Sequence, residues 1–372
     1  MLYDKQMKTL SIESPTQIQY EKLSNNSFHD LQCPCSHIST KYSEFLQFQP
    51  TYHQICSSIF VSPLWKKWET LWNGGQSCRM GDFYNFAHFY FPLLSEYCRI
   101  SNETIWNELT RLYDMEYITS SIIPKEQFHR EMQSFIENFK IQTQNSFKIK
   151  LNIIRSIIFD NRLLPQLGRV SDYVPPSDIT MKYLPENYEN CSCETDSTCQ
   201  RTMYFCRNNI FTYIQNLSMG CYLSDSLFSS SISCFYNEIC LDVIKKQMSQ
   251  RTELYYDVRP LDSSEKSQYR TDISIKTLTD NLFIEKWNDF YSYQIYYNSC
   301  QPSICSYKIK LRPSFLDLIT KLLSIYNGLT ILYQFLIPNI VRLIRRKKSQ
   351  RRRSEYCNLI IPLQSDVSIW IH

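Results

Sequence analysis

Cysteine is the residue type whose number and spacing could do chemistry in this chain. The 372 residues include 15 cysteines, of which all but Cys357 precede an apolar stretch near the C-terminus. So large an even set is typical of proteins that fold in an oxidising compartment, where thiols become crosslinks. Reduced thiols or zinc sites are the alternative, but the spacings lack the paired C-x2-C knuckles of structural zinc sites. We therefore predict disulfides among Cys33, Cys35, Cys56, Cys78, Cys98, Cys191, Cys193, Cys199, Cys206, Cys221, Cys234, Cys240, Cys300 and Cys305.

Connectivity cannot be read from spacing alone, so most of the pairing stays open. Nearest-neighbour spacing makes Cys234–Cys240 and Cys300–Cys305 the predicted local bridges. Four N-x-S/T sequons are compatible with passage through the secretory pathway and give glycosylation candidates at Asn25, Asn102, Asn190 and Asn216.

Motifs of enzyme active sites are missing from the sequence. It contains no GxGxxG, GxxxxGK[ST], HExxH or GxSxG, and its six glycines are scattered. A Cys/His cluster could be drawn around His37 and His53, but no spacing singles out a metal site or a catalytic pair. We expect a protein that is not an enzyme and that holds no cofactor or metal.

An uncharged stretch of 20 residues, numbers 322–341, is long enough to cross a bilayer as a helix of about 30 Å. The sequence predicts a transmembrane helix over residues 315–344 and a basic tail over residues 345–372. Lys and Arg concentrate on the cytosolic side of membranes, so we expect an extracellular body and a cytosolic C-terminus, at the plasma membrane. A buried helix followed by a nuclear-localisation-like run is the alternative.

Asn327 and Gln334 interrupt this apolar stretch with amides that lipid cannot satisfy. Packing between helices satisfies such groups, so we expect a homo- or hetero-oligomer formed through this helix. The positive charge is concentrated in the tail, so the body should not bind nucleic acid. The N-terminus has no apolar signal-peptide region, and a missing upstream membrane helix is therefore expected.

The remaining chain divides into an entry segment, residues 1–30, and a cysteine-rich extracellular domain, residues 31–314. Within that domain the pattern over residues 82–164 is helical. An apolar stripe at spacings of three and four predicts one long helix, or two in line, through Phe128, Met132, Phe135, Phe139, Phe147, Leu151, Ile154 and Ile158. The predicted fold is α+β: a disulfide-rich ectodomain with a long helical hairpin-like segment and one C-terminal transmembrane helix.

Four stretches carry a resemblance to a known kind of protein: LQCPCSHIST with YHQICSS, CSC–x5–C, CFYNEIC, and YYNSCQPSICSY ahead of a helix with Asn327–Gly328–Leu329. They resemble an expanded family of uncharacterised invertebrate membrane proteins with two membrane helices around a cysteine-rich ectodomain. The layout is also similar to degenerin/epithelial sodium channels, although the Gly-x-Ser filter of those channels is missing here. The resemblance implies a degenerin-like ion-channel subunit. A non-conducting cell-surface recognition or adhesion protein is the alternative.

Overall fold

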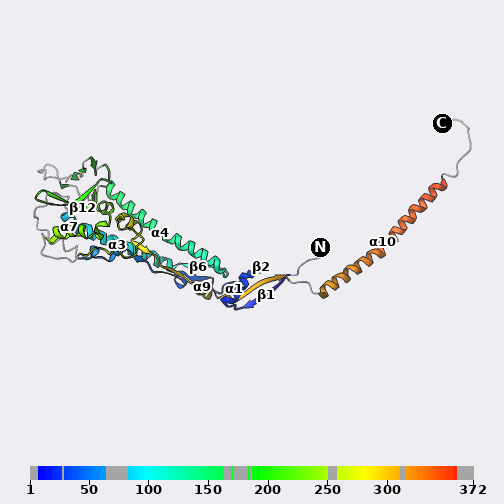
Figure 1. Ribbon diagram of the computed structural model, residues 1–372. Helices are drawn as coiled ribbons and strands as arrows, with labels where there is room; N and C mark the ends of the chain where they lie inside the picture. Colours follow the sequence, from blue (N-terminus) through cyan, green and yellow to red (C-terminus); the bar gives the residue numbers. More distant parts are fainter. Residues whose placement is uncertain are drawn as a thin grey trace, which may run out of the picture. The chain divides into compact units, whose positions relative to one another are not determined.

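The computed structural model describes residues 7–26, 29–63, 83–161, 169–170, 183–184, 187–188, 190–193, 195–249, 258–310 and 315–357. The chain forms two compact units (Figure 1). Unit 1 comprises Met1–Ile12, Ser27–Leu31 and Ser306–His372, and unit 2 comprises Glu13–Asn26 and Gln32–Cys305. Helices, short strands and several disulfides occur together, which confirms the mixed, disulfide-rich fold predicted from the sequence.

Unit 1 is built on a three-stranded sheet and one long helix. The central strand is β15 (Ile304–Lys310), with β1 (Met7–Glu13) and β2 (His29–Gln32) on its two sides. Lys308 on β15 pairs with Asp30 on β2 at 2.7 Å. The helix α10 runs over Phe315–Cys357, and so continues well past the predicted boundary at residue 344.

α10 confirms the predicted helix but not its transmembrane character. In the part of the chain that the structure describes, no helix combines the length and the apolar character needed to cross a membrane. The physical reason lies in the predicted span itself, where Asn327, Gln334 and Asn339 introduce amides and Pro338 removes a backbone donor.

Two long helices form the scaffold of unit 2. They are α3 (Phe83–Asp114) and α4 (Lys125–Asp160), joined through the short strand β6 (Glu116–Ile118). This arrangement confirms the hairpin-like helical segment. The stripe on α4 buries Phe128 and Phe147, as its spacing predicts, but Ile154 is 52% exposed, so the predicted packing face ends before the last turns.

The amino-terminal half of α4 packs into an aromatic core. α2 (Tyr42–Phe45) and α9 (Tyr293–Cys300) supply most of its other rings. Phe128 stacks on Tyr296 with 4.7 Å between ring centroids, and Tyr42 stacks on Phe135 at 4.6 Å. Each such pair adds about 0.5–1.5 kcal/mol beyond the area that it buries, so these rings fix α4 against the rest of the unit.

Short antiparallel pairs join the first and last thirds of unit 2. β4 (Leu46–Phe48) pairs with β14 (Asp289–Tyr291), and β5 (Thr51–Tyr52) pairs with β13 (Ile284–Lys286). β3 (Ser39–Lys41) pairs with β6. Residues some 240 positions apart are therefore neighbours here.

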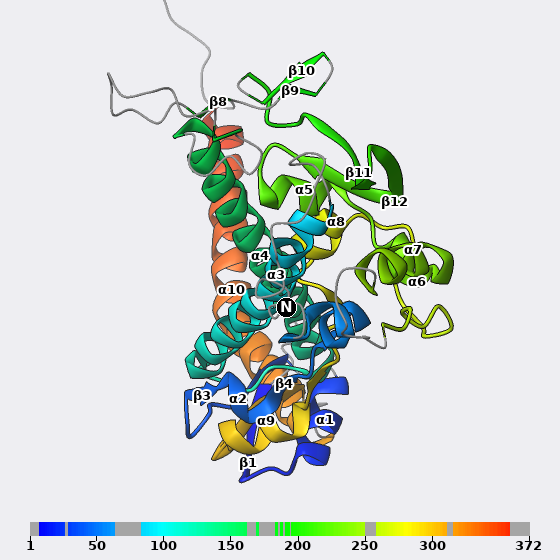
Figure 2. The same ribbon diagram turned by 90° about the vertical axis from the view of Figure 1, so that its left-hand side faces the viewer.

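The other end of unit 2 combines a hairpin with several helices (Figure 2). β11 (Gln200–Arg207) and β12 (Ile210–Gly220) form the hairpin. Arg155 of α4 pairs with the buried Asp225 of α5 (Leu223–Ser229) at 2.5 Å. The remaining elements are α1 (Gln17–Asn25), the 3-10 helices Gln54–Ser57 and Ile59–Val61, β7 (Arg169–Val170), β8 (Tyr183–Leu184), β9 (Asn187–Tyr188), β10 (Cys191–Ser192), α5 (Leu223–Ser229), α6 (Ser233–Tyr236), α7 (Glu238–Ser249) and α8 (Ile275–Asp280).

Candidate functional site

The described cysteines from Cys33 to Cys305 form crosslinks rather than free thiols. Among the described residues the complete disulfides are Cys33–Cys305, Cys35–Cys300, Cys56–Cys98, Cys191–Cys199, Cys193–Cys221 and Cys234–Cys240. Cys206 is disulfide-bonded as well. Cys78 lies outside the described residues. The predicted local bridge Cys234–Cys240 is confirmed.

The predicted bridge Cys300–Cys305 is wrong. Cys300 ends α9, and Gln301 then takes a left-handed conformation with φ 43°, which turns the chain into β15. The Cys-Pro-Cys segment, residues 33–35, runs alongside that turn, because Cys35 and Pro302 form an antiparallel β-bridge through their backbones. Each of its cysteines therefore meets a different partner, with Cys33 bonded to Cys305 and Cys35 to Cys300.

Three sulfur atoms lie close enough together to suggest a metal site. Those of Cys193, Cys199 and Cys221 all fall within 4.8 Å of one another. All three are used in disulfides, however, and a metal-binding cysteine must be a thiolate. The cluster is therefore two adjacent crosslinks that fasten the base of the β11–β12 hairpin.

The four sequon asparagines are all exposed. Asn25 ends α1, Asn190 precedes β10, and Asn216 lies in β12 with φ 61°. Asn102 differs, because it sits inside α3 and its Oδ1 accepts a 2.8 Å hydrogen bond from the Tyr52 hydroxyl. Glycosylation of Asn102 would therefore compete with its hydrogen bond to Tyr52.

Asn327 and Gln334 lie on one face of α10, because a spacing of seven residues is nearly two full helical turns. Both are exposed. The opposite face carries an apolar series at the same spacing, Leu322, Leu329 and Leu336, with exposed fractions of 58%, 48% and 46%. α10 therefore presents a polar seam and an apolar face within one segment.

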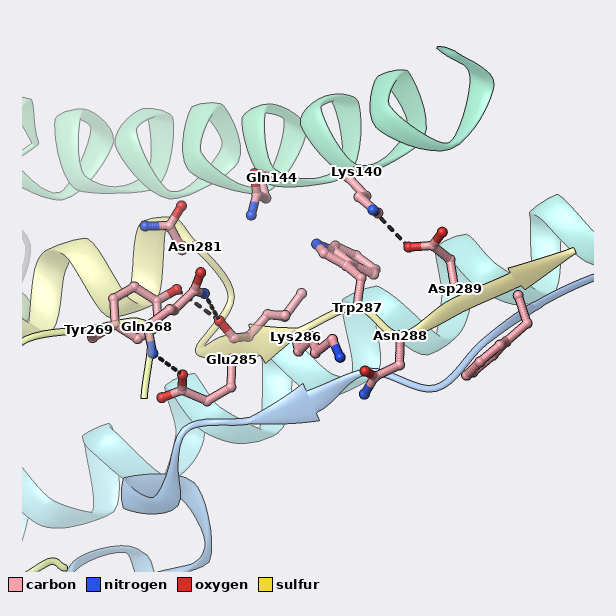
Figure 3. A pocket seen from close by; sticks show the side chains of 12 residues that line it. Lys140, Gln144, Gln268, Tyr269, Asn281, Glu285, Lys286, Trp287, Asn288 and Asp289 are labelled. Atoms are coloured by element: carbon pink, nitrogen blue, oxygen red, sulfur yellow. Dashed lines mark hydrogen bonds and ion pairs between the residues drawn. The ribbon is translucent and has the colours of Figure 1, made fainter. Parts of the chain in front are cut away.

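Unit 2 contains a groove of about 510 Å³ between α4 and the stretch from Ile284 to Phe290 (Figure 3). Lys140 and Gln144 come from α4, and Glu285 and Asp289 from β13 and β14. Tyr269 closes one end, where its hydroxyl donates to the Ile284 carbonyl at 2.8 Å.

Three of the four charged side chains that line the groove, those of Lys140, Asp289 and Glu285, have partners in the described chain. Lys140 donates to Asp289 and to Glu137, each at 2.8 Å. Burial disfavours the charge of Lys140, but these two hydrogen bonds outweigh burial and raise the pKa of Lys140 above its ordinary value. Glu285 accepts from the Ser267 hydroxyl at 2.7 Å and from the Gln268 backbone at 2.9 Å.

Trp287 forms the floor of the groove. Its side chain is only 9% exposed, and its ring meets Phe48 and Phe139 edge to face at centroid distances of 6.0 and 6.1 Å. In Figure 3 its indole nitrogen and the Gln144 amide both point into the space between α4 and the strand. Within the described chain, neither side chain has a hydrogen-bond partner.

A buried histidine stands behind the groove. His53 is 1% exposed, its Nδ1 accepts from the Ile55 backbone at 3.2 Å, and its Nε2 lies 3.3 Å from the Tyr236 hydroxyl and 3.9 Å from Glu285. Burial lowers the pKa of His53, which the charge of Glu285 only partly opposes. The neutral form is therefore favoured in the folded protein.

Sequence reasoning missed the groove entirely. Its walls are more than a hundred residues apart in the chain, and the only local signal was the aromatic stretch beginning at Trp287, which is typical of strands. Comparison with known proteins gives no further guide to this site: no family model, curated protein or solved structure matches the chain.

Proposed function

We propose that this chain is a membrane-anchored extracellular recognition protein, with α10 as its anchor and unit 2 as its ligand-facing body. The observation that carries the proposal is the exposure of α10. Leu323, Ile331 and Phe335 are 55%, 56% and 70% exposed, and the helix carries no charge from residue 322 to residue 341. Apolar surface left in water costs about 25 cal/mol per Å², so this segment requires a cover, which lipid provides.

The polar seam of α10 supports anchoring by an assembly rather than by a lone helix. If helices pack with Asn327 and Gln334 facing one another, the amides satisfy each other and the leucine face is left for lipid. The cations that follow, from Arg342 onward, favour a cytosolic end at this side.

The disulfides support an extracellular body. Crosslinks of this number persist in oxidising compartments and are rare in the cytosol. They also stiffen the region from which α10 departs, since Cys305 lies in β15, the strand just before that helix.

Alkaline carbonate extraction tests the proposal. The full chain is directed into the secretory pathway of cultured cells with a cleavable signal sequence, and membranes are then washed at high pH. We expect it in the pellet, with endoglycosidase-sensitive sequons. The variant Ile331→Asp/Leu332→Asp should move to the supernatant, because two charges in the middle of the span oppose insertion.

A matched control uses the exposed isoleucine pair of α4. Ile153→Asp/Ile154→Asp changes side chains that are 53% and 52% exposed, close to the fractions at Ile331 and Leu332, and should leave the protein in the pellet. Release of the wild-type chain by carbonate, or equal release of both variants, would remove the basis for membrane anchoring.

A second candidate, a subunit of an ion-conducting assembly, is favoured by one observation. The amides of Asn327 and Gln334 repeat along one face of α10 and are suited to line a wet path between helices. Recordings from cells that express the surface-delivered protein test it, and the absence of any current would leave recognition as the function.

A further inference from the structure

We infer that the cationic end of α10, residues 342–351, binds the headgroups of anionic phospholipids such as phosphatidylserine. The inference names a lipid class for the anchor proposed above, and it rests on that anchor because the cations must lie at a membrane surface. Its evidence is the placement of charges along and around the helix, which is separate from the apolar surface that carries the anchor.

The cationic end carries six positive charges and no negative one. All six side chains are exposed, and within the described chain none of them forms an ion pair: Arg342, Arg345, Arg346, Lys347, Lys348 and Arg351. Other cations of the chain do have partners, as Lys140 has in Asp289. So dense a set of like charges repels itself, and an anionic partner relieves that repulsion.

The cations surround the helix instead of forming one face. At about 100° per residue, Arg351 lies on the side of α10 opposite to Arg342. Lys347 and Lys348 lie between these two, one on each flank. A nucleic-acid groove or an acidic protein face meets a helix from one side and would leave the cations of the other side unpaired. The headgroups around a helix that enters a leaflet meet all of them.

The charges also lie at the depth of the headgroups. Residues 322–341 are uncharged, and Arg342 follows directly. The helix from Arg342 to Lys348 is about 9 Å long, and the headgroup layer is about 5–8 Å thick on each side of the hydrocarbon core. Arg351 lies less than one turn farther on and is still within the Debye length of about 8 Å at physiological salt.

Two exposed apolar side chains within the cationic end distinguish lipid from nucleic acid. Leu343 and Ile344 are 62% and 59% exposed and lie between Arg342 and Arg345. A phosphate backbone offers these side chains no apolar contact, whereas the boundary between headgroups and acyl chains takes them up. A zwitterionic headgroup carries a cation of its own, so the ring of cations favours an anionic phospholipid.

Spin-labelled lipids measure this selectivity on the full chain, reconstituted into phosphatidylcholine vesicles with labels in both leaflets. Electron spin resonance separates labelled lipid immobilised at the protein from labelled lipid that moves freely, for phosphatidylserine and phosphatidylcholine in turn. A headgroup next to a cation gains about fivefold in affinity, the equivalent of about 1 kcal/mol. Only one end of α10 carries cations, so the average preference for phosphatidylserine should be about threefold at about 0.1 M salt. It should approach unity at about 1 M salt, where the Debye length is about 3 Å.

A quadruple variant and a matched control locate the binding. The variant replaces the four consecutive cations with glutamine, a good helix former, and its preference should fall below about twofold: Arg345→Gln/Arg346→Gln/Lys347→Gln/Lys348→Gln. The control removes the same charge from four exposed lysines of unit 2 that have no ion pair in the described chain, and it should keep the wild-type preference: Lys41→Gln/Lys150→Gln/Lys266→Gln/Lys286→Gln.

Equal immobilisation of the two lipids by the wild-type chain, or the same preference in both quadruple variants, would overturn the inference and leave α10 as an anchor. Immobilisation of neither lipid would remove the anchor, and the inference with it. A fluorescent DNA duplex is the competing probe for the full chain in detergent. If the chain binds the duplex and shows no lipid preference at the same salt concentration, the cationic end is a nucleic-acid site and the inference is wrong.

Discussion

The two disulfides that join the Cys-Pro-Cys segment to the end of unit 2 should stabilise the fold in a non-additive way. Cys33–Cys305 spans 272 positions and Cys35–Cys300 spans 265, and one loop lies just inside the other. When either bond is present, the other closes only a small ring of about nine residues, made of the two cysteine segments.

The chain-entropy relation gives the size of each effect. Closing a loop of that small size is worth about 2.5 kcal/mol, whereas closing the first long loop is worth about 5.5 kcal/mol. Replacing either pair with alanine should therefore lower the free energy of unfolding by about 2.5 kcal/mol. Replacing all four cysteines should lower it by about 8 kcal/mol, which exceeds the sum of the two single losses by about 3 kcal/mol.

Guanidinium unfolding of the full chain without reductant, followed by tryptophan fluorescence, measures these differences. The control is Cys234→Ala/Cys240→Ala, which opens a separate loop of six positions. Its loss, also about 2.5 kcal/mol, should simply add to that of either long-range pair. Strict additivity between the two long-range pairs would refute the nested-loop reasoning.

Three further outcomes are expected. Burial lowers the pKa of His53 below its ordinary value of 6.5, so the folded state binds fewer protons than the unfolded state. The stability of the fold should therefore fall as the pH drops through 6.5. Thermal melts should show a weaker pH dependence in His53→Gln. Arg155→Met leaves the buried Asp225 carboxylate unpaired and should cost about 3 kcal/mol in urea unfolding, while adding Asp225→Asn should restore much of the loss; equal losses would contradict a charge effect. Asn327→Leu should weaken crosslinking between copies, or alter any current, without reducing surface delivery, as measured by surface biotinylation.

Local patterns in the sequence were enough to locate some elements and not others. The spacing of Phe128, Met132 and Phe147 predicts α4, because a helical stripe depends only on neighbours three and four residues away. The Cys234–Cys240 bridge is local in the same sense. Ile154 breaks the pattern, since exposure depends on whether another element happens to cover that turn.

Long-range pairing could not be predicted in this way. Cys300 and Cys305 are close in sequence, yet the turn at Gln301 directs each toward a different cysteine of residues 33–35, which no spacing rule contains. The groove depends on the same kind of information. Lys140 meets Asp289 only because α4 and the β4–β14 pair lie side by side, and that arrangement is set by packing throughout unit 2.

The two long-range disulfides also make most of unit 2 a covalent ring. A protease that cuts once anywhere between Cys35 and Cys300 would produce two fragments that stay joined through Cys33–Cys305 and Cys35–Cys300. Such a nicked protein would run as one species on a non-reducing gel and separate only with reductant. Its body would also remain attached to α10, whereas a cut between Cys305 and Phe315 would separate the disulfide-linked body from that helix.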